Sequence, residues 1–264
     1  MNWENLNQIV ALRTSGRVEE SIAKLEELRV SERDTLANAI ALMEIVNGLR
    51  LLKRHSEART KIDEACALLG PEHEFYPRLA FLDALIEMDN NSWKSALSKL
   101  DLMFERYQTI LRSEDHGDLL DEVQRNRGTA LMNLQRFAEA VPLLESVRSI
   151  EFDREATLCD LGVCQFKLRE YDSAKETFEE LLSLGPNSRF RANAHYNLGI
   201  IMFYKGFVAK GKREFEECLR CPDRVPLSDD NLLDWLITCS KELAEPSEVQ
   251  KYTEMKESLR TSLG

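Results

Sequence analysis

The stretch Glu155–Ser188, EATLCDLGVCQFKLREYDSAKETFEELLSLGPNS, has the apolar spacing of two amphipathic helices joined by a short turn. Gly162 lies in the middle of the first predicted helix, where glycine costs about 1 kcal/mol relative to alanine and commonly marks a close approach of another backbone. We expect Ala174 on the second helix to face it. Asp172 is the expected N-cap of that helix. Gly185–Pro186 is expected to end it, because proline cannot continue a helix.

This arrangement resembles the tetratricopeptide repeat. The family pattern has a small residue in the first helix, an aromatic residue before the second helix, an alanine, a bulky apolar residue four positions later and a closing proline. These positions are occupied here by Gly162, Tyr171, Ala174, Phe178 and Pro186. The first-helix tyrosine of the family is replaced by Gln165. The resemblance implies an all-α fold, in which helix pairs stack into a right-handed α-solenoid superhelix.

Weaker copies of the pattern recur along the whole chain. Together they predict seven helix pairs, about fourteen helices, at residues 2–35, 39–72, 77–110, 121–154, 155–188, 192–225 and 229–262. Additional residues at Leu111–Leu120 are expected to extend a helix and to form a turn at residues 114–117. A lone helix pair cannot bury enough apolar surface to offset the ordering of its backbone, and no Gly/Ser/Pro-rich linker interrupts the series. We therefore expect residues 1–264 to form a single domain.

Composition and charge exclude several classes of function. The chain has 264 residues, of which 43% are hydrophobic and 31% charged, as in folded helical proteins. Its formal net charge is −11, and the acidity is spread over both halves. Binding to a phosphate backbone requires clustered Lys and Arg, so a nucleic acid partner is not expected.

The expected location is the cytoplasm. The N-terminal residues MNWENLNQIV lack the basic start and the apolar run of a signal peptide. No window approaches 18 consecutive apolar residues, so no membrane span is predicted. The six cysteines are then expected to remain reduced thiols.

Cys218 and Cys221 form the one motif with reactive chemistry, a CxxC that can be a redox dithiol or half of a zinc site. A zinc site needs two more ligands, and the sequence has no second CxxC and no paired histidines. We interpret both cysteines as small core residues. Glycine-rich phosphate loops and the metalloprotease and serine hydrolase motifs are absent. We therefore predict no catalytic residue, no metal site and no cofactor, and expect that the protein is not an enzyme.

The resemblance also implies a binding surface, because first helices of such arrays line a concave face that holds partner segments. Projected onto this geometry, the polar side chains on two first helices are Arg125, Asn126, Thr129, Asn133, Asn193, Tyr196 and Asn197. Asparagine amides both donate and accept hydrogen bonds, which suits sequence-tolerant capture of an extended peptide. The alternative interpretation is that these are ordinary solvated helix positions.

Some proteins of this family bind the C-terminal carboxylate of chaperones through lysine, asparagine and arginine on successive first helices. Arg125 fills one cationic position, but Asp160 would repel a carboxylate. Asn193 and Asn197 occupy positions where cations are needed. Recognition of chaperone tails is therefore not expected.

Three hypotheses of function follow. The leading one is a non-enzymatic protein–protein interaction scaffold that binds a peptide segment or helix of a partner protein in its concave groove. The second is a self-assembling or regulatory subunit that uses its convex or terminal surfaces. The third is a thiol-redox or metal-binding protein acting through Cys218 and Cys221. The sequence predicts neither the identity and charge of the partner nor the oligomeric state.

Overall fold

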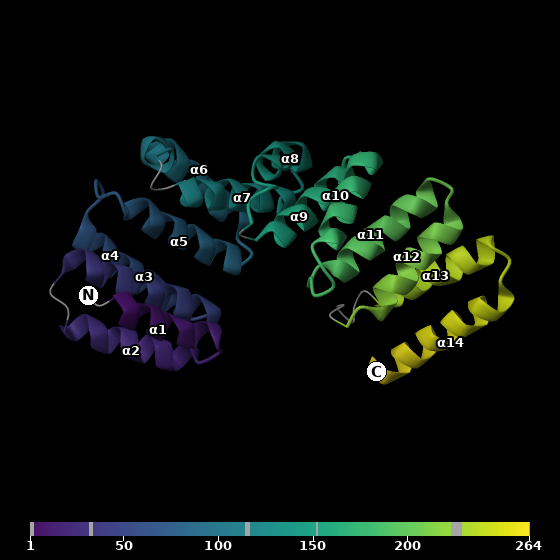
Figure 1. The fold of residues 1–264 in the computed structure, drawn as a ribbon, viewed down its shortest axis with the longest axis horizontal. Coiled ribbons are helices and arrows are strands. Elements are labelled where there is room, and N and C mark those ends of the chain that lie inside the picture. The colour runs from purple at the N-terminus through teal and green to yellow at the C-terminus, as the bar shows by residue number, and fades with distance from the viewer. Residues whose placement is uncertain (1–2, 32–33, 114–116, 152, 223–228, 264) are drawn as a thin grey trace. The chain divides into compact units, whose positions relative to one another are not determined.

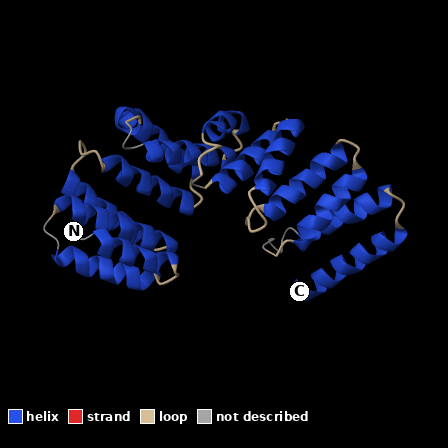
Figure 2. Cartoon of the chain, viewed as in Figure 1, coloured by secondary structure: helices blue, strands red, loops and turns tan. Residues whose placement is uncertain are grey.

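The computed structural model describes residues 3–31, 34–113, 117–151, 153–222 and 229–263. These residues form fourteen α-helices and no strand (Figure 2). The predicted all-α fold of helix pairs is therefore confirmed. By its internal contacts the chain divides into two compact units, Met1–Gln135 and Arg136–Gly264.

The first unit consists of helices that each pack on the next one along the chain (Figure 1). They are α1 (Trp3–Thr14), α2 (Val18–Ser31), α3 (Thr35–Leu51), α4 (His55–Leu69), α5 (Tyr76–Asp89), α6 (Trp93–Leu111) and α7 (Gly117–Asn133). Alternate helices also touch: α1 contacts α3, α3 contacts α5, and α5 contacts α7. The first helices of successive pairs thus lie side by side, as stacked helix-pair repeats require.

The core of the first unit is centred on α3, which packs against helices on several sides. Its residues Leu42, Ile45 and Val46 are fully buried. This explains why α3 is apolar around most of its circumference, unlike a surface helix with one apolar stripe.

The second unit has the same neighbour-on-neighbour packing, with an additional contact between α9 and α11. Its helices are α8 (Phe137–Ser146), α9 (Arg154–Lys167), α10 (Tyr171–Ser183), α11 (Arg191–Tyr204), α12 (Val208–Arg220), α13 (Asp229–Glu242) and α14 (Pro246–Leu263). The division between the units falls inside the predicted repeat at 121–154, whose helices α7 and α8 belong to different units. The single domain over 1–264 stays a prediction.

Glycines in the second unit make room for aromatic rings. A Cβ placed on Gly162 would lie 2.7 Å from the Phe178 ring, and one on Gly199 would lie 2.5 Å from the Phe215 ring. Both rings are fully buried. Ala174 was predicted to face Gly162; the atoms nearest to a Cβ at Gly162 belong to the ring of Phe178, which also lies on α10.

The turns within helix pairs share one backbone geometry. The middle residue of each three-residue turn has a positive φ, and these residues are Gly16, Lys53, Asn91, Gln135, Arg169, Gly206 and Ala244. In most of them the next N–H donates to a carbonyl five residues earlier, as from Arg54 to Leu49 at 2.9 Å. This is the hydrogen bond of a Schellman helix end, which satisfies an otherwise unpaired carbonyl.

The two ends of α10 test two predictions made from the sequence. The helix α10 begins at Tyr171 with Glu170 at the N-cap, so the prediction of Asp172 as N-cap is wrong. Asp172 instead lies in the first turn, where a carboxylate interacts favourably with the helix dipole, and it pairs with Lys205. The end of α10 before Gly185 is confirmed, with Gly185 at φ 136°.

Of the additional residues at Leu111–Leu120, only Leu111 extends α6, and Gly117–Leu120 form the start of α7. The helix α6 continues to Leu111 over 19 residues, with a kink at Tyr107 (φ −113°, ψ 15°). The predicted turn at 114–117 lies outside the described residues, except that Gly117 begins α7.

Candidate functional site

Two of the predicted binding residues on α7 donate hydrogen bonds to backbone carbonyls of their own helix. Asn126 is 7% exposed, and its Nδ2 donates to the Glu122 carbonyl at 2.7 Å. Asn133 is exposed, and its Nδ2 donates to the Thr129 carbonyl at 2.8 Å. Arg125 is half-buried. Each asparagine amide on α7 therefore has a hydrogen committed to a carbonyl one turn earlier.

The predicted residues on α11 are arranged differently. Asn197 is 9% exposed, and its Nδ2 donates to both the carbonyl and the side-chain Oδ1 of Asn193, at 2.9 and 2.8 Å. This bond fixes the exposed Asn193 side chain with its oxygen toward Asn197. The Nδ2 group of Asn193 and the hydroxyl of Tyr196 have no hydrogen-bond partner among the described residues. The α11 face thus presents one amide donor and one phenol.

Aromatic side chains continue this face toward the end of α11. Phe203 contacts Trp235 of α13 at a centroid distance of 5.2 Å, and Trp235 stacks on Phe215 of α12 at 5.6 Å. The Tyr196 ring meets the edge of Phe215 at 6.0 Å. Tyr204 is 61% exposed, although its ring lies 6.2 Å from Trp235. A partly open aromatic surface therefore adjoins the polar groups of α11.

Phe203 and Tyr204 are not among the residues predicted from the sequence. They follow Tyr196 by seven and eight residues, a spacing that places them on the same side of a helix two turns later. That spacing was the available signal. The contact with Trp235 had no local signal, because it joins α11 to α13.

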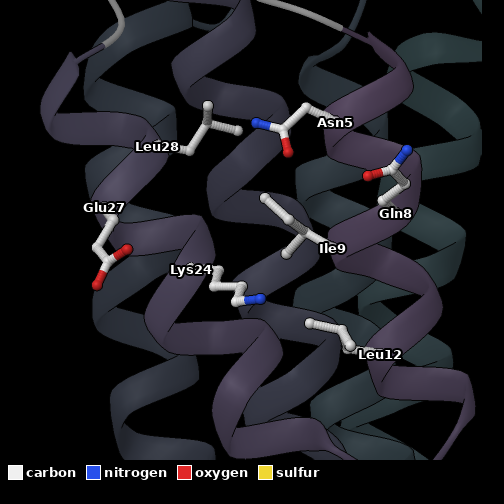
Figure 3. Close-up of a pocket in the computed structure, with 7 residues that line it drawn as sticks. All are labelled: Asn5, Gln8, Ile9, Leu12, Lys24, Glu27 and Leu28. Carbon is white, nitrogen blue, oxygen red and sulfur yellow. The ribbon is translucent and has the colours of Figure 1, made fainter.

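A hollow of about 570 Å³ lies between α1 and α2 (Figure 3). Its apolar side chains are Ile9, Leu12 and Leu28, and its polar ones include Gln8 and Lys24. Lys24 is paired with Glu20 at 3.3 Å. The mixed lining has no convergent charge, so it points to no particular ligand chemistry.

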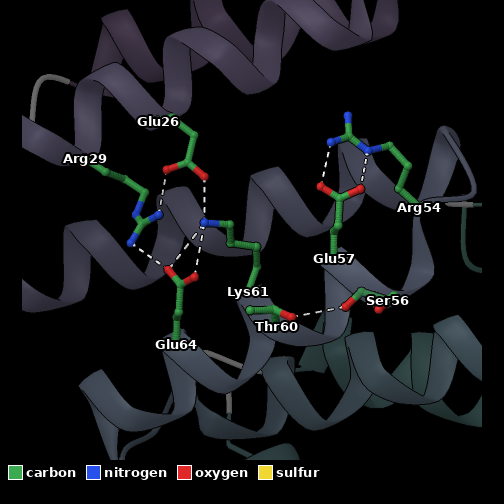
Figure 4. A network of polar contacts seen from close by, with 8 residues as sticks. All are labelled: Glu26, Arg29, Arg54, Ser56, Glu57, Thr60, Lys61 and Glu64. Carbon is green, nitrogen blue, oxygen red and sulfur yellow. Dashed lines mark hydrogen bonds and ion pairs between the residues drawn. The ribbon is translucent and has the colours of Figure 1, made fainter.

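Charged side chains on α2 and α4 form a closed network (Figure 4). Lys61 Nζ lies 2.8 Å from Glu26 and 3.1 Å from Glu64, while Arg29 bonds the same two carboxylates at 2.7 and 3.1 Å. Partial burial opposes the charge of Lys61, but the hydrogen bonds to Glu26 and Glu64 outweigh it and raise the pKa of Lys61. These charges satisfy one another and join two second helices.

The cysteines are embedded in helix packing. Cys218 and Cys221 are 4% and 8% exposed, and the Cys221 thiol donates to the Glu217 carbonyl at 3.4 Å. All six cysteines are free thiols. Burial raises the pKa of Cys159 and of Cys164 to about 12, which suppresses the reactive thiolate. Within the described ranges no three His, Cys, Asp or Glu side chains group in a way that could hold a metal ion.

Among the helices that the structure describes, none combines the length and apolar character needed to cross a bilayer.

Comparison with known proteins identifies the fold. Residues 160–188 match the sequence model of the tetratricopeptide repeat. PilF of Pseudomonas aeruginosa superposes with a TM-score of 0.62 at 16% identity, over 84% of this chain and 91% of PilF. The quorum sensor NprR of B. thuringiensis, in its apo form, gives 0.73 at 16% identity, over 97% of this chain and 74% of NprR.

A third solved structure is YrrB, described as a tetratricopeptide repeat protein with an unusual peptide-binding site. It gives a TM-score of 0.53 at 18% identity, over 70% of this chain and 86% of YrrB. No curated protein matches the chain by sequence. Residues 160–188 thus form a tetratricopeptide repeat, and the fold of the chain is that of solved tetratricopeptide repeat proteins.

Proposed function

We propose that this chain is a non-enzymatic scaffold that binds a peptide segment or a helix of a partner protein along its first helices. The fold supports a protein-binding role, since one solved structure of this fold, YrrB, is described as having a peptide-binding site. The proposal places the main binding surface on α11, in the second unit, and treats α7, in the first unit, as a separate and weaker surface.

The observation that carries the proposal is the combination of groups on α11. The hydrogen bond from Asn197 orients the side-chain amide of Asn193, whose Nδ2 group can donate to a ligand. Tyr196 provides a hydroxyl. An extended peptide has unpaired backbone carbonyls that such donors can bind. Tyr204 and Trp235 then provide an aromatic surface for an apolar side chain of the ligand. Aromatic residues of this kind commonly contribute most of the binding energy of an interface.

The buried asparagines act as supports in this proposal. Asn197 holds Asn193 in place, and Asn126 caps a carbonyl of its own helix. On α7 the side chains offered to a partner are Arg125, Thr129 and Asn133. Because both asparagine amides of α7 are engaged within the helix, we assign α7 the weaker contact.

The test uses a random peptide library displayed on phage and selected on the purified full chain. Affinities of the enriched peptides are then measured by fluorescence polarisation for the wild type, Asn193→Ala and Tyr204→Ala. We expect each variant to weaken binding about tenfold, or about 1.4 kcal/mol. The matched control is Phe207→Ala, another exposed aromatic residue, for which we expect less than about a twofold change. Failure to enrich any peptide, or equal effects in control and test variants, contradicts the proposal.

A further inference from the structure

A second hollow, of about 330 Å³, lies where α11 begins. It is formed by the loop before α11, the first turns of α11 and the end of α12. Among the described residues its lining includes Arg189, Arg191 and Arg220, the carboxylate of Glu217 and the imidazole of His195. This concentration of arginines is unexpected in a chain with a net charge of −11.

Two of these arginines have no ion-pair partner among the described residues. Arg220 is paired with Glu217, which neutralises both side chains. Arg189 and Arg191 form no ion pair within the part of the chain that the structure describes. Arg189 is held over the ring of Phe190, with its guanidinium carbon 4.8 Å from the ring centroid. Beside the hollow, the charges of Arg189 and Arg191 therefore have no ion-pair partner among the residues that the structure describes.

His195 supplies an independent indication of a ligand. Its side chain is 8% exposed and lines the hollow. Its Nδ1 lies 2.8 Å from Glu214 Oε2, while the buried Nε2 has no hydrogen-bond partner among the described residues. A buried polar atom without a partner costs about 1–3 kcal/mol. A ligand in the adjoining hollow would relieve that cost.

The start of α11 adds backbone donors. Phe190 is at the N-cap and makes no side-chain capping bond. The N–H of Arg191 donates to the Ser188 carbonyl at 3.2 Å, whereas the next N–H groups receive no capping bond from Phe190. The helix dipole favours an anion at this end. Ser188 Oγ accepts the N–H of Phe190 at 3.2 Å, which fixes the loop that carries Arg189.

We propose that this hollow binds a phosphoryl group, carried either by a small phosphomonoester or by a phosphoserine in a peptide. Two unpaired arginine forks and a helix N-terminus match the charge and the several acceptor oxygens of phosphate. His195 Nε2, which has no partner among the described residues, adds a polar atom that a phosphate oxygen or hydroxyl can bond. Phosphate is favoured over a carboxylate because it carries more negative charge and more acceptor oxygens.

The experiment is isothermal titration of the full chain with inorganic phosphate, with acetate, and with a serine peptide in phosphorylated and unphosphorylated forms. The test variant is Arg189→Gln/Arg191→Gln. The control is Arg213→Gln, an exposed arginine of α12 that also lacks an ion pair among the described residues. Circular dichroism establishes that each variant is folded. A second readout is the ¹⁵N resonance of the His195 ring.

We expect phosphate or the phosphopeptide to bind the wild type, to shift the His195 ring signal, and to bind the double variant about tenfold more weakly. The control variant should stay within about twofold. If inorganic phosphate binds and the phosphopeptide does not, the site is assigned to small phosphomonoesters. If the phosphopeptide binds more tightly than inorganic phosphate, the site is assigned to modified proteins. Absence of both, equal binding of acetate or of the unphosphorylated peptide, or equal loss in the control overturns the proposal.

Discussion

The helices α7 and α11 carry similar polar stretches, and their hydrogen bonds make them different surfaces. On α7, Asn133 donates to the backbone carbonyl of Thr129, four residues earlier. On α11, Asn197 has another asparagine four residues earlier and donates to its side chain as well as its carbonyl. The second arrangement leaves Asn193 oriented, with its own amide donor available. The asparagine one turn later therefore orients Asn193 toward a ligand, whereas Asn133 donates to its own helix.

The packing beneath the two helices differs as well. The helix α7 is anchored by aliphatic side chains such as Leu119 and Val123, both fully buried. The helix α11 lies against aromatic rings through a glycine, with Phe215 filling the space above Gly199. A ring wedged against a backbone has little freedom to move, so we expect the α11 surface to depend more steeply on single residues.

The largest effect is expected from Phe215→Ala. Phe215 is fully buried and supports Tyr196 and Trp235, so its removal leaves a large cavity beneath the α11 face. We expect a loss of about 3–5 kcal/mol in the free energy of unfolding, measured with urea. The exposed Phe207→Ala should cost less than about 0.5 kcal/mol. Similar losses in both variants would mean that Phe215 does not support the α11 face.

The next largest effect on stability is expected from replacing a glycine by alanine in the second unit, compared with the same change in the first unit. A Cβ on Gly199 would lie 2.5 Å from the buried Phe215 ring, so Gly199→Ala should destabilise by about 1–3 kcal/mol. A Cβ on Gly48 of α3 would lie 2.9 Å from Cγ1 of Ile22, a milder overlap with a side chain that is only partly buried. There, the gain of about 1 kcal/mol in helix propensity offsets the crowding, and we expect little change. Thermal unfolding of both variants measures the difference, and equal shifts would contradict this contrast.

The unit that contains α7 is also expected to respond to acid through Glu87. Its carboxylate lies 2.9 Å from Lys99 Nζ and 2.7 Å from Arg59, and the hydrogen bond to Lys99 is the main cause of its lowered pKa. A lowered pKa stabilises the fold above the ordinary glutamate value of about 4.3, and this stabilisation is lost as the pH falls through the folded value.

The variant Glu87→Gln should therefore be less stable than the wild type by about 1 kcal/mol at pH 7 and equally stable near pH 3. Urea unfolding at the two pH values provides the measurement. A difference that persists unchanged at the lower pH would show that the charge of Glu87 is not responsible.

The smallest effect concerns the turns, which are the same in both units. Ala244 has a φ of 56°, which is unfavourable for a residue with a Cβ, so Ala244→Gly should stabilise by about 0.5–1 kcal/mol. The reverse change at Gly206 (φ 80°), Gly206→Ala, should destabilise by a similar amount. Chemical denaturation midpoints distinguish the two signs, and the same sign in both would contradict the argument.

Much of the fold could be predicted from local sequence, because apolar spacing and helix-ending residues act within one helix pair. The end of α10 before Gly185 is an example. The left-handed turns at Lys53 and Gln135 could not be predicted in this way, since neither residue is a glycine and neighbouring helices impose the geometry. The division after Gln135 likewise has no composition signal.

Less of the candidate site could be predicted. Helical projection selected Asn126 and Asn197 as surface residues, but both are nearly buried by neighbouring helices. The aromatic surface depends on contacts between helices: Tyr196 of α11 contacts Phe215 of α12, and Phe203 of α11 contacts Trp235 of α13. Projection along one helix contains no information on such contacts.

The most direct test of the account compares Asn193→Ala on α11 with Asn133→Ala on α7 in the affinity of one selected peptide. Both are exposed asparagines on first helices, so the truncations are chemically matched. We predict about tenfold weaker binding for Asn193→Ala and less than about twofold for Asn133→Ala. Equal losses, or the larger loss at Asn133, would contradict the claim that α11 is the main binding surface.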